Sequence, residues 1–494
     1  MSKVKIRDLV VILPGIMGSV LEKDDRDLWE ISGQSIWDAV TSWGSSLHGL
    51  ALQQDDWEAD DLGDGIKATR VMENFHLVPG LIKVVDGYTH LRQLFRESFE
   101  VTPGTLDGKK EANYFEFPYD WRRDNRAAAR QLKTLIDKKL PEWREKSGAK
   151  DAKVLLIAHS MGGLIARYYL ENLEGENWRN CKALITFGTP YRGSIKALKS
   201  LSHPYKNLFL DLTTVIRSFN SLYQLLPIYE VLKDGSNYKR VKDAESIPGV
   251  NKECAIKGDA FHREIETAVE ANRKNAAYHE QGYKIIPIVG SRQPTYQSAE
   301  LTNGKLTVSH ATPDIVSDFL WDGDGTVPRA SATPLELSDE YSETFFAEQH
   351  GALQGNTQVL EQLYERIKQM QVTSLAAVRE PEPAPKAQEH PALGLEVDDW
   401  YSQGEPVEII AKLVNAEYYQ SPIIVDVKSM TTDLKDVRLQ LKQTKSEGGI
   451  STWRGTLEDL SPGTYHLNLR GKTLGPLDPP PVQDIFEVGA NTID

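Results

Sequence analysis

A serine lies where a strand pattern changes into a helix pattern. The apolar run Val154–Ile157 leads into the sequence AHSMG at residues 158–162, and apolar residues then recur at helical spacing. A strand, a sharp turn with a serine and a helix form a nucleophile elbow, in which a strained backbone pushes the hydroxyl out of the top of a sheet. The positions two before and two after the serine must be small because they crowd each other, and Ala158 and Gly162 meet that limit. The pattern predicts that Ser160 is a nucleophile, the alternative being an ordinary strand-to-helix turn.

A serine nucleophile needs a base, and the base needs a group that orients it. In enzymes with this elbow, the acid and then the histidine follow the serine along the chain. His310 and His350 are the histidines after Ser160 that lie outside the predicted insertion, linker and C-terminal strands. His350 directly follows the last apolar strand pattern, so its loop would lie over the top of the sheet. We expect His350 to be the base, the alternative being an exposed loop histidine.

The segment WDGDGTVP at 321–328 is the expected source of the orienting acid. Asp324 lies between two glycines, which permit an unusual backbone and a close approach. A carboxylate there can accept the imidazole N–H and fix its tautomer. Asp322 is the second candidate, although an aspartate at that position also suits an Asx turn with the backbone of its own loop.

Two backbone N–H groups are needed to stabilise the oxyanion that forms when such a serine attacks a carbonyl group. One is expected from Met161, the residue after the nucleophile. The other is expected from the loop PGIMGS at 14–19, which directly follows the apolar run 7–13. Ile16 is the first choice in this loop and Met17 the second, and the alternative is a plain glycine turn.

The candidate residues lie near the ends of short apolar segments that alternate with helix patterns. The sequence predicts strands at 7–13, 112–120, Val154–His159, Lys182–Phe187, Tyr283–Val289 and Glu343–Ala347, and helices at 124–140, 162–173 and 356–372. Short apolar strands separated by helices indicate a mostly parallel sheet covered by helices on both faces. Two insertions, at about 20–110 and 194–280, interrupt this pattern, and we expect the second to be helical.

The helix patterns stop after residue 373. Residues 374–394 carry four prolines among charges, a composition typical of a stiff, solvated linker. Residues 395–494 then show short, partly alternating strand patterns, which predict a small immunoglobulin-like β-sandwich, and Tyr465 suits a tyrosine corner whose hydroxyl bonds to nearby backbone. Since few contacts normally cross such a linker, we expect the sandwich to be dispensable for the chemistry of residues 1–373 and to serve location or partner choice.

A series of motifs gives the chain a specific resemblance. In order, LPGIMGS, PYDWRRD, AHSMGG, FGTPYRGS and GDGTVP resemble the lecithin:cholesterol acyltransferase and lysosomal phospholipase A2 branch of the α/β-hydrolases, over about residues 7–372. The resemblance implies an α/β-hydrolase fold with a helical cap. It also implies that Ser160 is the nucleophile, that Asp324 and His350 complete a triad, and that Ile16, which follows PG, lends an N–H to the oxyanion hole. Members of this family hydrolyse ester-linked acyl chains, and some transfer the acyl group to an alcohol.

We therefore expect a serine hydrolase that cleaves carboxylic esters, with lipid or phospholipid acyl esters as substrates, through an acyl-enzyme on Ser160. An O-acyltransferase that passes the acyl chain to an alcohol is the first alternative, and a catalytically silent scaffold or binding protein is the second. The segment 206–232 carries large apolar residues near helical spacing, and as a cap over the site it would form an acyl-chain tunnel. Its candidates for substrate binding are Leu212, Phe219, Tyr223 and Leu226, the alternative being that they form the core of the cap.

Two further motifs have both a structural and a functional interpretation. In PYDWRRD at 118–124, Arg122 and Arg123 are expected to pair with carboxylates and hold their loop, the alternative being that they position substrate. The motif GTPYRG at 188–193 ends a predicted strand, where it either lines the pocket or forms a structural turn.

The overall composition narrows the classes of partner. The chain has 494 residues and a formal net charge of −14, which argues against a nucleic-acid partner because phosphate binding needs clustered Lys and Arg. The sequence has no run of about 18 apolar residues that would indicate a membrane span, and its N-terminal apolar run is interpreted as a strand, so we expect a cytoplasmic location. The two cysteines form no metal set, and we expect neither a metal nor another cofactor. The C-terminal sandwich is the expected contact with a protein or a membrane surface.

Overall fold

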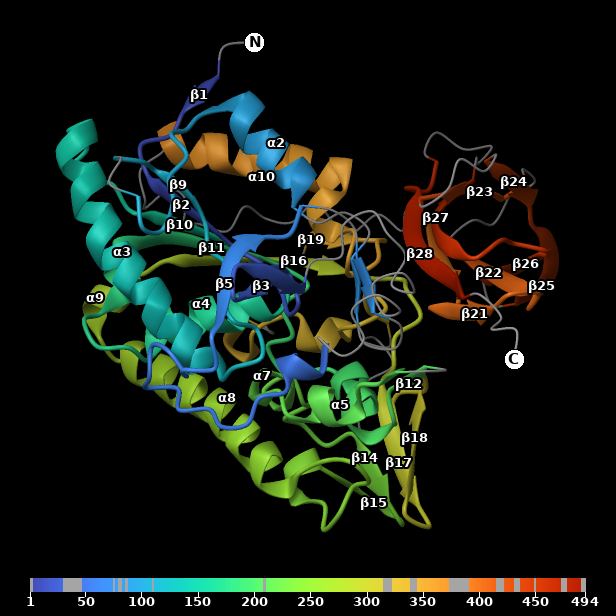
Figure 1. Ribbon diagram of the computed structural model, residues 1–494. Coiled ribbons are helices and arrows are strands. Elements are labelled where there is room, and N and C mark those ends of the chain that lie inside the picture. Colours follow the sequence, from blue (N-terminus) through green and yellow to red (C-terminus); the bar gives the residue numbers. More distant parts are fainter. Residues whose placement is uncertain are drawn as a thin grey trace.

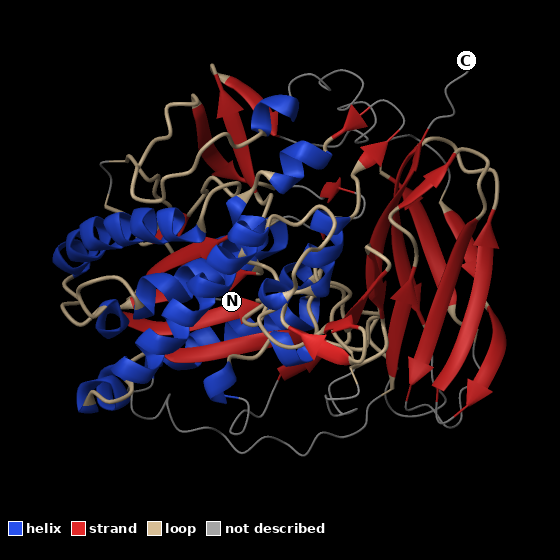
Figure 2. Cartoon of the chain, turned by 90° about the horizontal axis from the view of Figure 1, so that it is seen from below, coloured by secondary structure: helices blue, strands red, loops and turns tan. Residues whose placement is uncertain are grey.

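The computed structural model describes residues 3–29, 47–73, 76–78, 82–84, 88–108, 111–207, 210–313, 322–337, 344–372, 391–414, 422–430, 436–447, 450–471 and 478–489. They form a larger α/β lobe and a smaller lobe of β-sheet near the C-terminus, which lie side by side (Figure 1 and Figure 2). Most of the predicted linker, at 373–390, lies outside the described residues.

A six-stranded parallel sheet forms the centre of the larger lobe. Its strands run in the order β19 (Thr344–Phe346), β16 (Lys284–Gly290), β11 (Cys181–Phe187), β10 (Val154–His159), β2 (Leu9–Leu13) and β9 (Tyr114–Glu116). Every pairing between neighbours is parallel. Each strand overlaps a segment predicted from its apolar run, because a strand covered on both faces needs an almost uninterrupted series of apolar residues. The loops that follow the strands all leave the same edge of the sheet.

Alternate residues of these strands face opposite layers of helix. In β10, Leu155 and Ile157 pack in a cluster with α2 (Thr89–Ser98) and α10 (Thr357–Val372). Leu156 and Ala158 of the same strand pack with α3 (Asn125–Ser147) and α4 (Met161–Glu171). Figure 1 shows α2 and α10 together on one side of the sheet and α3 and α4 on the other. The sheet is thus the middle of three layers, as the alternation of strand and helix patterns predicts.

Helix α3 is longer than the sequence predicts. It begins after Asp124, whose side chain accepts the Arg126 N–H, and it ends at Gly148, where φ is +71°. The predicted end at residue 140 is wrong, because the helix continues through Pro141. A proline inside a helix leaves one carbonyl without its N–H donor, but Pro141 lies on the exposed side, where water can satisfy that carbonyl.

The two insertions add smaller sheets and helices to the larger lobe. The first contributes an antiparallel sheet of β3 (Ser19–Lys23), β4 (Arg26–Trp29) and β5 (Ile66–Val71). The second contains α5 (Ile195–Ser202), α6 (Thr213–Arg217), α7 (Asn220–Tyr223), α8 (Lys252–Asn272) and α9 (Ala276–Gln281). It is not purely helical, since β14 (Leu232–Asp234) and β15 (Asn237–Lys239) join β17 (Ser298–Thr302) and β18 (Lys305–Ser309) in a four-stranded sheet. Three further pairs of strands among the described residues are too short to give a sequence pattern. They are β1 (Val4–Lys5) with β8 (Phe99–Glu100), β6 (His76–Val78) with β7 (Ile82–Val84), and β12 (Lys206–Asn207) with β13 (Leu210–Asp211).

Two facing sheets form the smaller lobe. One contains β20 (Ala392–Glu396), β22 (Val407–Val414), β26 (Ile450–Leu457) and β25 (Lys442–Glu447), and the other contains β21 (Trp400–Ser402), β28 (Val482–Gly489), β27 (Gly463–Arg470), β23 (Ile424–Ser429) and β24 (Val437–Gln440). Apolar residues of both sheets share one core, and Figure 2 shows the two layers of strands facing each other. The Tyr465 hydroxyl donates to the Ser461 carbonyl at 2.6 Å, which is the hydrogen bond expected of a tyrosine corner.

The two lobes are hydrogen-bonded to each other. The Gln293 side chain of the larger lobe bonds to Leu393 and Leu395 of β20, and the Gln483 N–H of β28 donates to the Glu348 carboxylate at 3.3 Å. β20 begins at residue 392, within the segment predicted to be linker. The expectation that few contacts join the lobes is therefore wrong. Proline content indicates that a connecting segment is stiff, but it does not determine whether the units at its two ends pack together.

Arg122 and Arg123 hold the first insertion against the rest of the larger lobe. The Arg122 side chain is fully buried and pairs with Asp120 at 2.6 Å and with Asp64 at 2.9 Å. Arg123 pairs with Asp55 at 3.1 Å. These contacts confirm the expectation that both arginines pair with carboxylates and hold their loop.

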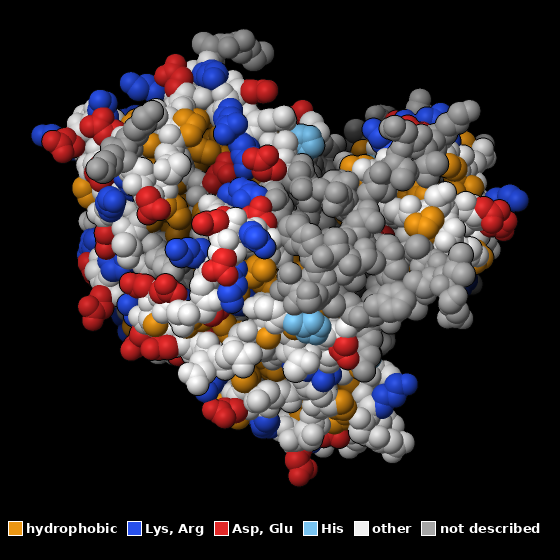
Figure 3. All heavy atoms as spheres, in the orientation of Figure 1, with side chains coloured by type: hydrophobic (Ala, Val, Ile, Leu, Met, Phe, Trp, Pro, Cys, Tyr) orange, Lys and Arg blue, Asp and Glu red, His pale blue; other side chains and the backbone are white. Residues whose placement is uncertain are grey.

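The surface carries charges of both signs. On the face shown in Figure 3, the described Lys and Arg side chains are interspersed with Asp and Glu side chains and do not gather into one patch. Among the helices built from described residues, none is both long and apolar enough to cross a membrane.

Replacing Arg122 with Met should destabilise the protein by about 3–5 kcal/mol, because it removes one partner of a buried ion pair and leaves the two carboxylates uncompensated. The measurement is the free energy of unfolding in urea. The control Arg70→Met removes an exposed ion pair with Asp27 in the same insertion and should cost only about 0–1 kcal/mol. Equal losses of unfolding free energy in the two variants would contradict the role given to Arg122.

Candidate active site

Ser160 lies between the end of β10 and the start of α4. Its φ of 51° and ψ of −123° form a strained conformation for a residue with a side chain. Neighbouring contacts hold this conformation, since the Ser160 N–H donates to the Phe187 carbonyl at 2.8 Å and the Thr189 hydroxyl donates to the Ser160 carbonyl at 2.9 Å. A Cβ atom at Gly162 would lie 2.5 Å from the Pro14 carbonyl oxygen, so this position requires glycine. The strand, sharp turn and helix predicted around Ser160 are therefore present.

Ser160, His350 and Asp324 form a continuous hydrogen-bonded chain. The His350 Nε2 atom lies 2.9 Å from Ser160 Oγ, and His350 Nδ1 lies 2.7 Å from Asp324 Oδ2. All three residues are buried. In a neutral imidazole, a proton on Nδ1 faces the carboxylate and leaves Nε2 to accept the proton of the serine hydroxyl. The structure thus brings together the three residues singled out in the sequence, in an arrangement that can activate a serine as a nucleophile.

Asp324 is oriented by its own loop. Its Oδ1 atom accepts the N–H groups of Thr326 at 2.9 Å and Val327 at 2.7 Å, and its carbonyl accepts the His350 N–H at 2.7 Å. Gly188, with φ of +54°, leaves room beside the pair, because a Cβ atom there would lie 2.7 Å from Asp324 Oδ2 and 2.8 Å from His350 Nδ1. The carboxylate therefore points at the imidazole without depending on a bound ligand.

Asp322 and His310 lie outside this chain. The Asp322 Oδ2 atom accepts the Arg292 N–H at 3.0 Å, which is a contact with a different loop rather than an Asx turn within its own. The His310 ring stacks on the Tyr296 ring, with 4.6 Å between the centroids. The geometry therefore favours Asp324 over Asp322 and His350 over His310.

The loop after β2 passes directly beside the serine. A Cβ atom at Gly15 would lie 3.0 Å from the Ser160 Cβ, and Ile16 lines the same pocket as Ser160. Met161 is the first residue of α4, and the first N–H groups of a helix have no partner within the helix. Met17, the next residue of the loop after β2, has a positive φ of 59°. Ile16 and Met161 thus border the serine from two sides.

A second hydrogen-bonded chain joins this loop to His350. The Gly15 N–H donates to the Tyr88 hydroxyl at 2.8 Å, Tyr88 Oη lies 3.0 Å from His159 Nδ1, and His159 Nε2 lies 3.2 Å from the His350 carbonyl oxygen. A backbone N–H can only donate and a carbonyl can only accept. A neutral His159 that carries its proton on Nε2 satisfies every group in the chain, with the Tyr88 hydroxyl donating to Nδ1.

Tyr88 and His159 were not singled out by the sequence analysis. His159 precedes Ser160 at the end of a buried strand, and a buried imidazole needs hydrogen-bond partners, so its position was a usable signal. Tyr88 lies in the first insertion, 71 residues from His159, and no sequence pattern connects the two. Their role depends on how the insertion packs, which the sequence does not reveal.

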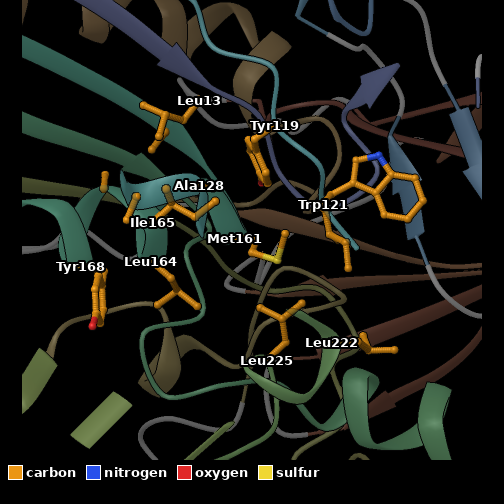
Figure 4. Packing of buried hydrophobic residues seen from close by; sticks show 14 of the residues in the cluster. Leu13, Tyr119, Trp121, Ala128, Met161, Leu164, Ile165, Tyr168, Leu222 and Leu225 are labelled. Carbon is orange, nitrogen blue, oxygen red and sulfur yellow. The ribbon is translucent and has the colours of Figure 1, made fainter. Parts of the chain in front are cut away.

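A pocket opens beside Ser160 and His350. Its apolar lining residues are Ile16, Pro190, Ala197, Leu222, Leu225 and Val327. Its polar lining residues are Ser194, Lys196, Ser200 and Thr326. Figure 4 shows Leu222 and Leu225 from the second insertion close to Met161 at the start of α4. The pocket thus lies between the elbow and the second insertion, and the motif at 188–193 contributes to it through Pro190.

The four substrate-binding candidates of the second insertion do not line this pocket. Leu212, Phe219, Tyr223 and Leu226 are instead buried in the core of the larger lobe. The segment 206–232 is not one helix either, because the backbone is extended at Phe219, between α6 and α7. Its apolar residues therefore do not share the face of one helix, although they belong to one buried cluster. The alternative that these residues form the core of the cap is the one supported by the structure.

Replacing Asp324 with Asn should slow the labelling of Ser160 by a fluorophosphonate probe by at least about a hundredfold, because an amide that donates to Nδ1 holds the imidazole in the wrong tautomer. The rate is measured by mass spectrometry over a time course. The control Asp322→Asn changes the same loop, and its rate of Ser160 labelling should stay within about threefold of the rate of the unaltered protein. A larger effect of Asp322→Asn would transfer the orienting role to Asp322.

Tyr88→Phe should slow the same labelling by about tenfold and cost about 1–2 kcal/mol of stability, since it leaves the Gly15 N–H and His159 Nδ1 without their partner. Tyr223→Phe is the matched control, because it also removes one buried hydroxyl, which donates to the Arg217 carbonyl at 3.1 Å. This control should lose similar stability and keep its labelling rate. If Tyr88→Phe behaves as the control does, the chain through His159 is structural only.

Comparison with known proteins gives one family and several distant structures. No curated protein matches this chain. Phospholipase PlaB from Legionella pneumophila is 8% identical, with 98% of this chain and 92% of that chain covered and a TM-score of 0.25. The CARDB domain of a Pyrococcus furiosus protein is 12% identical, with 20% and 87% covered and a TM-score of 0.15, and the superoxide reductase of Ignicoccus hospitalis is 11% identical, with 20% and 80% covered and a TM-score of 0.15. At these TM-scores none of the three indicates a shared fold.

The family match covers the elbow. Residues 106–274 match the model of the lecithin:cholesterol acyltransferase family. This range includes Ser160 and ends before Asp324 and His350. The match confirms the resemblance predicted from the sequence: between residues 106 and 274, this chain is similar to the lecithin:cholesterol acyltransferase family.

Proposed function

We propose that this protein is a serine hydrolase of the α/β-hydrolase fold that cleaves carboxylic esters of lipids through an acyl-enzyme on Ser160. The observation that carries the proposal is the chain of hydrogen bonds from Ser160 Oγ through His350 to Asp324. The fold assignment is supported by the parallel sheet order and by the elbow between β10 and α4. A silent scaffold would not need a strained serine aligned with a buried imidazole and carboxylate.

In the proposed reaction, His350 acts first as a base and then as an acid. Its Nε2 atom accepts the hydroxyl proton while Ser160 Oγ attacks the ester carbonyl carbon. When the tetrahedral intermediate collapses, the bond from carbon to the alcohol oxygen breaks and His350 returns the proton to the leaving alcohol. A water molecule then loses a proton to His350 and attacks the carbonyl carbon of the acyl-enzyme. The bond from that carbon to Ser160 Oγ breaks, His350 returns the proton to Oγ, and the carboxylic acid is released.

The negative charge on the carbonyl oxygen needs donors that are in place before the reaction. We assign this role to the N–H groups of Ile16 and Met161, which border Ser160 from the loop after β2 and from the start of α4. The Asp324 carboxylate stabilises the imidazolium that forms in each step, because it already accepts the Nδ1 proton.

The apolar lining of the pocket favours a hydrocarbon acyl group as the part of the substrate that is bound. Its apolar side chains from Ile16, Leu222, Leu225 and Val327 meet at the nucleophile, and burial of a hydrocarbon chain against them contributes about 0.8 kcal/mol per methylene. Lipid and phospholipid esters carry such chains.

Transfer of the acyl group to an alcohol is the second candidate. The family match favours it, because the matched family is named for an acyltransferase. The chemistry of the acyl-enzyme is the same in both reactions, and only the second nucleophile differs. A lipid alcohol that binds beside the acyl-enzyme would replace water in the last step.

The test is turnover of a series of p-nitrophenyl esters by the full chain and by Ser160→Ala. The variant should fold normally and lose at least about a thousandfold in rate, the scale expected when a triad member is removed. Longer acyl chains should raise kcat/KM up to the length that the pocket accepts. Near-full activity in Ser160→Ala would refute the proposal. Phospholipid vesicles with and without an added fatty alcohol separate the two candidates, since an acyltransferase forms a new ester in place of free fatty acid.

A further inference from the structure

The first strand of the smaller lobe is bound by a side chain that stands next to the candidate site. Gln293 follows β16, and it is buried. Its Nε2 atom donates to the Leu393 carbonyl at 3.1 Å, and its Oε1 atom accepts the Leu395 N–H at 3.1 Å. One amide side chain thus satisfies a carbonyl and an N–H at the edge of β20, as a neighbouring strand would. Gly394 lies between them, and a Cβ atom there would lie 2.6 Å from the Arg292 carbonyl oxygen.

The residue before His350 takes part in the same contact. The Gln349 Nε2 atom donates to the Leu395 carbonyl at 3.1 Å and to Gln293 Oε1 at 3.2 Å. Gln349 also packs over Gly325, which directly follows Asp324. A single side chain therefore contacts β20, the segment after β16 and the loop of the acid, while its own backbone leads into the base.

A buried carboxylate links the other sheet of the smaller lobe to the same loop. Glu348 is fully buried, and its Oε1 atom accepts the Gln349 N–H at 2.9 Å and the Gln483 N–H of β28 at 3.3 Å. Its Oε2 atom accepts from Asn356 at 3.0 Å. Burial raises the pKa of Glu348 to about 7, so this carboxyl group depends on these donors when it is ionised.

The segment after β16 also holds the loop of Asp324. The Gln293 N–H donates to the Gly323 carbonyl at 3.0 Å, and the Thr295 hydroxyl oxygen accepts the Gly325 N–H at 2.8 Å. Both loops that carry the acid and the base are therefore connected, through one or two hydrogen bonds, to strands of the smaller lobe. The smaller lobe itself contributes no group that reaches Ser160 among the residues lining the pocket.

We propose that the smaller lobe positions His350 and Asp324 for catalysis, with Gln349 and Gln293 as the positioning residues that connect it to the two loops. The inference rests on the proposed function, since it concerns the same base and acid. The physical reason is that the reaction rate depends strongly on the positions of the catalytic groups. A displacement of about 1 Å in one such group can lower the rate by about a hundredfold. Loops are the most mobile parts of a fold, and His350 lies in a loop whose preceding residues, Glu348 and Gln349, bond to β28 and β20.

The test uses the full chain with Gln349→Met, which keeps the length of the side chain and removes its two donated hydrogen bonds. We expect kcat for a short soluble ester to fall about tenfold to a hundredfold, with KM within about twofold, because the pocket is untouched. The rate of Ser160 labelling by a fluorophosphonate should fall by the same factor. Gln293→Met should give the same pattern, and the double variant should lose little more than either single variant, because both act through one network.

The matched control is Arg438→Gln, which removes an exposed ion pair with Asp426 on the smaller lobe, away from β20 and β28. It should leave kcat and KM unchanged. Unaltered kcat and labelling in both Gln349→Met and Gln293→Met, with the thermal midpoint lowered, would overturn the inference and leave the smaller lobe as a stabilising attachment. Failure of the proposed function would appear differently, as absence of ester turnover and of Ser160 labelling in the unaltered chain.

Discussion

Three glycines allow the chain segments around Ser160 to approach one another closely. The turn after Ser160 touches the end of β2 at Gly162, the loop after β2 passes the serine at Gly15, and the loop after β11 passes the imidazole and the acid at Gly188. Larger residues at these points would hold the segments apart and would separate Ser160 Oγ from His350 Nε2. The parallel sheet makes this convergence feasible, because β2, β10 and β11 are neighbours and end at the same edge. The strain at Ser160, on the order of 1–3 kcal/mol, is offset by the hydrogen bonds that this close approach permits.

The histidine is fixed at each of its polar groups. Its ring lies between Ser160 and Asp324, its N–H donates to the Asp324 carbonyl, and its own carbonyl faces His159. A base that must move a proton twice in each turnover benefits from such restraint, because little reorganisation is then needed in the transition state. Because His159 also reaches the loop of Ile16 through Tyr88, the proposed base and the proposed oxyanion donors belong to one connected polar network.

Much of the arrangement of the larger lobe could be predicted because it depends on local patterns. Apolar runs identified the central strands, and the elbow followed from small residues around a serine between a strand and a helix. The residues brought together with Ser160 followed from their order along the chain and from their positions after strands. Phe219 and Tyr223 lie in the core and not in the pocket lining, because the apolar spacing of buried core residues does not differ from that of a helix that faces a pocket. Tyr88, Gln293 and Gln349 were missed because their hydrogen bonds join segments far apart in the chain, and an isolated tyrosine or glutamine carries no signature of its partner.

The late position of His350 and β20 in the chain has a consequence for biosynthesis. A ribosome completes the elbow and most of the parallel sheet well before it reaches these residues, and such segments begin to fold as they emerge. In the proposed arrangement, the nascent chain carries a strained serine whose hydroxyl has no base beside it, so it remains a poor nucleophile. In that arrangement, reactivity arises only after His350 has been added and lies beside Ser160. On this proposal, a chain that is terminated before His350 has no base beside Ser160 and is inert rather than damaging.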